Sequence, residues 1–125
     1  MDQNFSPAAQ NEPLLGFNYE NLEWEPVIAT HWKIADDSLT YWFRIDPRAR
    51  WSDGKPVVAD DVIHSWKLRV DEGILEPYSN QLYAKYTEPK AISKYIVETS
   101  TKSLNWRHFL YFSTMQILPA HYIKG

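Results

Sequence analysis

Residues 42–62 constrain the fold of this chain more than any other stretch, because they contain a transition from a strand to a helix. Apolar side chains recur at every second position over residues 39–46, which is the period of a strand with one buried face. Pro47 then ends the strand, since proline has no N–H for a hydrogen-bonded ladder. Farther on, Gly54 tolerates a positive φ angle after Asp53, so we expect a tight turn before the helix.

A second strand is expected immediately before the first. Residues 27–34 mix short apolar runs with alternation, and residues 36–38 are short polar side chains that bond their own backbone in turns. Residues 27–34 and 39–46 are therefore predicted to pair as an antiparallel hairpin. Farther upstream, Gly16 is expected to let the chain turn within the first apolar cluster.

The helix after the tight turn is predicted over residues 59–71. Asp60 and Asp61 favour the positive end of the helix dipole in the first turn, and Gly73 suits the end of the helix. Val58 occupies the expected N-cap position without a hydroxyl, so the helix forgoes about 1 kcal/mol of capping stabilisation. The apolar residues on one stripe of this helix are Ala59, Val62, Ile63, Trp66 and Val70.

The rest of the chain supplies further elements of both kinds. A short helix with loops is expected over residues 74–90, a strand over residues 91–99 and a mostly buried helix over residues 105–115. Residues 1–13 are polar and aperiodic, which indicates a loose lead-in. We therefore predict that residues 14–125 form a single α+β domain, in which helices pack on a small, mostly antiparallel sheet.

Composition argues against several classes of protein. The net charge is −3 and the 13 Lys and Arg residues form no basic run, so no nucleic-acid partner is expected. No run approaches the ~18 apolar residues of a membrane span. The polar, acidic residues 1–4 are unlike a secretory signal, so no signal peptide is expected within this chain. The absence of cysteine excludes disulfides and thiol chemistry.

Residues with catalytic or metal-binding chemistry are sparse. Asp36 and Asp37 fit a turn, and Asp60 and Asp61 fit a helix start, so neither carboxylate pair requires a catalytic role. The four histidines have no zinc-binding spacing, and the four glycines form no phosphate-binding loop. We therefore expect neither an enzyme nor a metal site, and no cofactor.

The turn and its flanking segments resemble the family 5 bacterial extracellular solute-binding proteins, the peptide, dipeptide and nickel receptors of ABC importers. The family signature places an aromatic residue before x-Asp-Gly-x-Pro, and this chain carries it at residues 51–56. Five further stretches match in sequence order: 25–32, 39–45, 62–66, 95–98 and 117–121. We expect the signature residues Trp51, Asp53, Gly54 and Pro56 to be structural rather than ligand-binding.

The resemblance also implies an architecture and a function. Family members are several times longer than this chain, with two lobes that close over the ligand and a smaller extra domain near the N-terminal lobe. The chain corresponds to that extra domain, as one domain of a larger periplasmic binding protein whose parent is exported. The implied function is capture of oligopeptides for an ABC importer, to which this domain contributes scaffold and pocket rim. The implied partners are the remaining lobes of the parent, its peptide or other small solute and, through the parent, the ABC permease.

One ligand-binding residue can be carried over. In peptide-binding members of the family, a Pro-Tyr pair after the long helix places a tyrosine beside the pocket. That pair is Pro77 and Tyr78 in this chain, so Tyr78 is the candidate, although packing within its own loop would account for Tyr78 equally well.

A second function remains open because the chain contains six Trp, eight Tyr and five Phe. Such a share fits a free-standing module that binds carbohydrate or another ligand on flat aromatic rings. That module would need Trp42, Trp51 and Trp106 on one exposed plane. A domain isolated from its lobes is also expected to expose an apolar face, which favours self-association.

Overall fold

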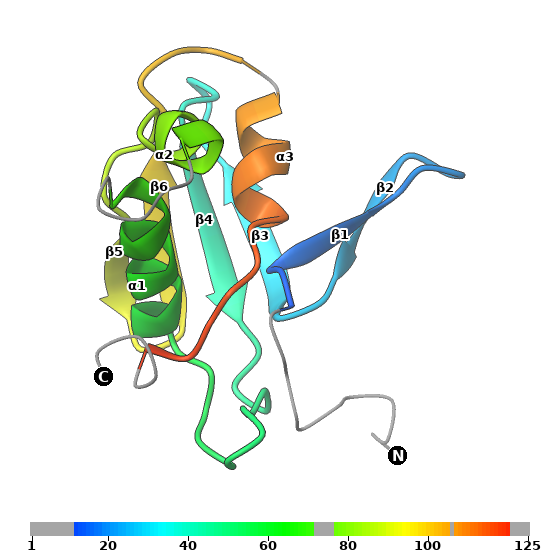
Figure 1. Ribbon diagram of the computed structural model, residues 1–125. Helices are drawn as coiled ribbons and strands as arrows, with labels where there is room; N and C mark the ends of the chain where they lie inside the picture. The colour runs from blue at the N-terminus through cyan, green and yellow to red at the C-terminus, as the bar shows by residue number, and fades with distance from the viewer. Residues whose placement is uncertain (1–11, 72–76, 106, 121–125) are drawn as a thin grey trace.

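The computed structural model describes residues 12–71, 77–105 and 107–120. The fold is α+β, as predicted, with helices packed against a small antiparallel sheet (Figure 1). The division into a lead-in over residues 1–13 and one domain over residues 14–125 stays a prediction. The elements in chain order are β1 (Leu15–Asn18), β2 (Glu23–Pro26), β3 (Ala29–Ile34), β4 (Thr40–Ile45), α1 (Ala59–Val70), α2 (Pro77–Tyr83), β5 (Lys90–Ser93), β6 (Ile96–Ser100) and α3 (Arg107–Ser113).

The main sheet has the strand order β3-β4-β6-β5, and every neighbouring pair is antiparallel. β3 and β4 form the hairpin predicted from the sequence, with Trp32 opposite Phe43. The helices lie on one face of this sheet (Figure 1). On the opposite face, His31, Lys33 and Arg44 remain exposed.

Alternation along β4 decides which of its side chains enter the core. Tyr41, Phe43 and Ile45 are at most 2% exposed, whereas Arg44 between them is exposed. Phe109 of α3 stacks on Phe43 with the ring centroids 5.5 Å apart. Such offset aromatic contacts add to the free energy of burial. The predicted burial of one face of residues 39–46 is therefore confirmed, and α3 covers that face.

The turn between β4 and α1 has the conformation that its sequence predicts. Gly54 adopts a φ of 89°, a value that residues with a Cβ rarely reach. The Trp51 N–H donates to the Lys55 carbonyl at 2.8 Å and closes the turn. Val58 is the N-cap of α1, and its side chain makes no capping hydrogen bond.

Asp61 joins three segments through one buried carboxylate. Its Oδ2 accepts hydrogen bonds from the Val58 N–H at 2.9 Å and from the indole Nε1–H of Trp51 at 3.0 Å. Its Oδ1 accepts from the Ala120 N–H at 2.8 Å. Hydrogen bonds to an ionised acceptor are stronger than neutral ones. The carboxylate therefore holds the signature turn, the start of α1 and the segment after α3 together.

β1 and β2 pair with each other as a hairpin, here called the arm, that extends away from the main sheet (Figure 1). The turn predicted at Gly16 is wrong, because Gly16 lies within β1 and pairs with Glu25. The chain reverses between β1 and β2 instead, where Asn18 Oδ1 accepts the Glu20 N–H at 2.9 Å and Leu22 adopts a φ of 59°. Asparagine stabilises such turns by bonding the backbone two residues on.

Two predicted elements also differ from the structure. Residues 91–99 do not form one strand, because the chain reverses at Lys94 and Tyr95 between the antiparallel strands β5 and β6. α3 is shorter than the helix predicted over residues 105–115, since Asn105 Oδ1 accepts the Arg107 N–H at 2.9 Å and precedes the first turn. Gly73, the predicted end of α1, lies outside the described residues. Within the described ranges, no helix is long and apolar enough to cross a membrane.

Replacing Asp61 by asparagine is expected to lower the free energy of unfolding by about 2–4 kcal/mol. The asparagine amide would turn an N–H group toward at least one of the three N–H donors that bind Asp61. That donor would then be left unpaired in the interior. Urea unfolding followed by tryptophan fluorescence measures the loss. Asp60→Asn is the matched control, because the Asp60 side chain is 48% exposed, and it should lose less than about 1 kcal/mol. Equal losses in the two variants would contradict the role of Asp61.

Asp46, which follows β4, should make the free energy of unfolding depend on pH. Burial alone raises the pKa of this carboxyl, but hydrogen bonds and charge from Arg48 outweigh it, so the pKa lies below the usual 3.8. Because the folded-state pKa is the lower one, Asp46 stabilises the fold above about pH 4 and loses that contribution as pH falls through the folded pKa.

The pH effect is measured as the difference in unfolding free energy between the wild type and Asp46→Asn. We expect a clear difference at about pH 7 that shrinks at about pH 3, where the carboxyl is increasingly protonated in both states. A difference that stays constant with pH would show that the charge of Asp46 contributes nothing.

Candidate functional site

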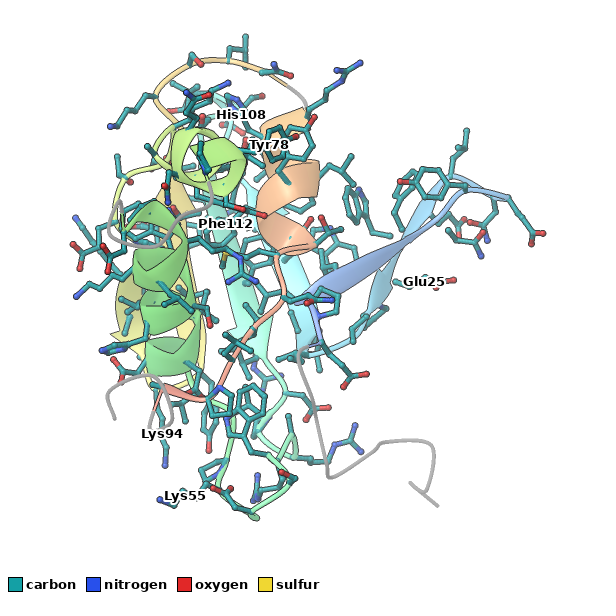
Figure 2. All side chains as sticks on the ribbon, in the orientation of Figure 1. Glu25, Lys55, Tyr78, Lys94, His108 and Phe112 are labelled. Carbon is teal, nitrogen blue, oxygen red and sulfur yellow. The ribbon has the colours of Figure 1, made fainter. Side chains whose placement is uncertain are left out.

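A polar cavity of about 280 Å³ lies between α2 and α3, and Tyr78 lines it. Tyr78 is the second residue of α2, and 73% of its surface is exposed. Tyr78 and His108 lie at the same end of the molecule, away from Lys55 (Figure 2). Polar side chains from both helices and the residues beside them contribute to the lining: Tyr78, Gln81, Lys85, Asn105, Arg107 and Tyr111.

His108 lines the same cavity, although the residue is only 2% exposed. Its Nδ1 lies 2.5 Å from Thr101 Oγ1 and 3.1 Å from the Ser103 carbonyl oxygen. The Thr101 hydroxyl also donates to the Ser103 carbonyl at 3.1 Å, so the three groups form one cluster. The imidazole is therefore fixed by the loop that precedes α3.

Hydrogen bonds from buried aromatic side chains hold the two sides of the cavity in place. The Tyr86 hydroxyl donates to the His108 carbonyl at 2.6 Å, and the Trp66 indole donates to the Tyr83 carbonyl at 2.9 Å. Burial raises the pKa of both Tyr83 and Tyr86, so the two phenols stay protonated. α1, α2 and α3 are thereby tied into one unit around the site.

Trp51 of the signature turn is part of the core. Trp51 is 2% exposed and its indole is bonded to Asp61, so the ring cannot stack on a ligand. This burial also argues against the carbohydrate module, which required Trp51 on an exposed plane. Trp42 lies on the open face of the sheet with its Nε1 bonded to Glu98 Oε2 at 2.8 Å. Trp106 lies outside the described residues.

The carboxylate pairs and histidines occupy separate places in the fold. Asp37 Oδ1 accepts the Leu39 N–H at 2.9 Å in the β3–β4 turn, and Asp61 is committed to three donors. His31, on β3, and His64, on α1, belong to different elements from His108, and His121 lies outside the described residues. Among the described residues, no group of three or more His, Cys, Asp or Glu side chains could hold a metal ion.

An apolar surface on the arm is a candidate site that the sequence did not reveal. Tyr19 is 74% exposed and Leu22 is 72% exposed at the turn of the arm. Together with Phe17, Trp24 and Leu110 they line a cavity of about 390 Å³. The signal in the sequence that could have revealed it is a set of apolar residues on both sides of a polar turn: Phe17, Tyr19, Leu22 and Trp24. We call the exposed apolar side chains of Tyr19 and Leu22 the arm surface.

Comparison with known proteins identifies the family. Residues 23–124 match the model described as bacterial extracellular solute-binding proteins, family 5 Middle. The periplasmic alpha-galactoside-binding protein of Rhizobium meliloti (strain 1021) is 27% identical over 126 residues, which cover 96% of this chain and 18% of that protein. The periplasmic murein peptide-binding protein MppA of Escherichia coli (strain K12) is 38% identical over 60 residues, which cover 48% of this chain and 11% of that protein.

Solved structures share the fold. The oligopeptide-binding protein AppA from Bacillus subtilis, in complex with a nonapeptide, superposes with a TM-score of 0.80 at 21% identity, over 92% of this chain and 23% of that chain. The α+β fold described above is thus that of one part of a periplasmic binding protein. The chain spans only 11% and 18% of the two curated relatives. Because the family model matches most of its residues, the chain belongs to the family 5 bacterial extracellular solute-binding proteins.

Proposed function

We propose that this chain is one domain of a periplasmic receptor that captures oligopeptides and presents them to an ABC permease. Its family consists of solute-binding proteins, so the proposed activity is binding rather than catalysis. One relative named as a murein peptide-binding protein and one solved relative with a bound nonapeptide favour a peptide as the solute. The chain would contribute scaffold and one rim of the binding pocket.

The exposure of Tyr78 is the observation that supports this role most directly. A tyrosine that only packed its own loop would be largely covered, yet 73% of Tyr78 is open to solvent beside a polar cavity. Ligand pockets combine apolar and aromatic contact area with a few polar groups that fix orientation. Tyr78 offers both a ring and a hydroxyl at such a rim.

The remaining lobes of the parent would supply the rest of the receptor. Tyr19 and Leu22 on the arm surface are largely exposed, and the neighbouring cavity has an apolar lining. Exposed apolar patches on a domain mark surfaces that another part of the protein or a partner covers. In the assembled receptor, the arm surface would therefore pack against another lobe.

The reading frame around the segment tests the proposal first. A continuous frame that encodes a signal peptide upstream and the two lobes around the segment is the expected result. A frame that encodes this segment alone would leave the chain without a second lobe to close over a ligand, and would contradict its role as a receptor domain.

Tyr78→Ala in the full-length receptor is expected to weaken peptide binding about tenfold, since a contact ring and its hydroxyl are lost. Tyr78→Phe, which keeps the ring, should weaken it less. Native mass spectrometry with a defined pool of tri- to pentapeptides measures the affinities, with an α-galactoside trisaccharide as a competing solute class.

Ile92→Ala is the matched control for the tyrosine variants, because Ile92 is an exposed apolar residue on β5 and not on α2. It should bind peptides like the wild type. Unchanged binding in Tyr78→Ala would remove this tyrosine from the site, and binding of the trisaccharide in place of peptides would assign a different solute.

The isolated chain is expected to self-associate through its arm surface. Burial of Tyr19 and Leu22 against a second copy removes apolar area from water at about 25 cal/mol per Å². Light scattering at several concentrations should show a mass that rises with concentration, and Leu22→Glu should abolish the rise. Ile92→Glu on β5 is the control, and a strict monomer at high concentration would contradict the prediction.

A further inference from the structure

We propose that the open face of the main sheet, opposite the helices, receives the arm tip (residues 19–23) of a second copy of this chain. The inference goes beyond the proposed function, because it concerns a contact between copies and does not depend on the solute. It names the surface on which the arm docks when the chain self-associates. Since the arm and the sheet are different surfaces, the contact is heterologous, and each copy offers its arm to one neighbour and its sheet to another.

The open face holds an apolar hollow that two cations line. Trp42 on β4 lies opposite Lys33 on β3, and Arg44 follows two residues along β4, so all three side chains share the face. Ile96 of β6 joins them in lining a cavity of about 160 Å³. The Lys33 Nζ lies 5.6 Å from the centroid of the Trp42 ring. The volume is well below the ~300 Å³ of small ligand pockets, so the hollow suits one aliphatic side chain rather than a solute.

The hollow has a positive charge that no carboxylate in its lining offsets. Lys33 and Arg44 are exposed, and none of the residues that line the hollow is acidic. Glu98 is the single acid in the four strands, and its Oε2 accepts the Trp42 indole N–H at 2.8 Å. Every strand and turn of the sheet, over residues 29–45 and 90–100, lies within the described part of the chain. The hollow therefore attracts an acidic partner.

The other acidic side chains near the sheet lie at one of its ends. Asp36 and Asp37 belong to the β3–β4 turn, where Asp37 Oδ1 accepts the Leu39 N–H at 2.9 Å. Lys94 lies in the turn between β5 and β6 at the opposite end, next to the pair formed by Arg44 and Ile96. The positive potential is thus strongest toward Arg44, and an acidic segment is expected to enter from that end.

The arm tip has the complementary groups. The two strands of the arm and the turn between them, residues 15–26, include Glu20, Glu23 and Glu25 and no lysine or arginine. Leu22 is 72% exposed and lies between Glu20 and Glu23, which are exposed as well. One aliphatic side chain between two carboxylates thus matches one apolar hollow lined by two cations. Such complementarity fixes the register of a contact and disfavours contacts between like surfaces.

The arm tip is held in one conformation before it docks. Asn18 Oδ1 accepts the Glu20 N–H at 2.9 Å, and the Asn18 carbonyl accepts the Leu22 N–H at 2.8 Å. Asn21 Oδ1 accepts the Glu23 N–H at 3.1 Å. The arm extends away from the main sheet, so a second copy can reach its tip (Figure 1). A tip that is already ordered loses less conformational entropy on binding.

Two charge-reversed variants and their mixture test the inference by light scattering at several concentrations. The chain itself is used, since the other lobes of the receptor would cover the arm surface. The face variant, Lys33→Glu with Arg44→Glu, and the arm variant, Glu20→Lys with Glu23→Lys, should each associate about tenfold more weakly than the wild type, because like charges then meet. An equimolar mixture should recover association, since the unchanged arm of one variant meets the unchanged face of the other. Recovery would also show that both variants are folded.

Lys55→Glu with Lys102→Glu is the control, because it changes the net charge equally and replaces two exposed lysines outside the four strands. It should associate like the wild type. Undiminished association of the face variant, equal weakening in the control, or a mixture that stays monomeric although circular dichroism shows both variants folded would each overturn the inference. A chain that stays monomeric leaves the receptor proposal standing if the full-length protein binds peptides. If the mixture recovers association but no peptide binds, the receptor proposal fails instead.

Discussion

The buried carboxylate of Asp61 is the interaction on which the arrangement of this domain depends. It accepts hydrogen bonds from the signature turn through Trp51, from the helix start through Val58 and from the far end of the chain through Ala120. Burying a charge costs free energy unless donors surround it, and here three donors do so. The same bonds explain how α1 begins without a hydroxyl cap, because the Asp61 side chain satisfies the Val58 N–H from within the helix.

Local patterns in the sequence were sufficient for the elements that this carboxylate connects. The alternation of residues 39–46 and the Asp53-Gly54 turn predicted β4 and its exit, because both signals are encoded within a few residues. The helix at residues 59–70 followed from its apolar stripe. In each case, tertiary packing reinforces the local preference.

Local sequence patterns did not predict how the short strands β5 and β6 pair. We predicted β5 and β6 as one strand because Lys94 and Tyr95 between them carry no strong turn signal. The chain reversal is stabilised by the pairing of β5 with β6 and of β6 with β4, rather than by the turn residues themselves. The cavity beside Tyr78 was equally hidden, since it joins residues 78–85 with residues 105–111. The contact that brings them together, from the Tyr86 hydroxyl to the His108 carbonyl, depends on folding and not on spacing. Family resemblance pointed to Tyr78, but not to the cations near it.

The buried carboxylate of Asp61 and the cavity between α2 and α3 occupy different parts of the domain. Asp61 holds the first turn of α1, whereas α2 and the cavity lie beyond its last turn. A helix of 12 residues is about 18 Å long, since each residue adds 1.5 Å. The exposed side chains that line the cavity can therefore change without disturbing the buried carboxylate of Asp61. Such a domain can keep one fold while the exposed groups around the cavity vary.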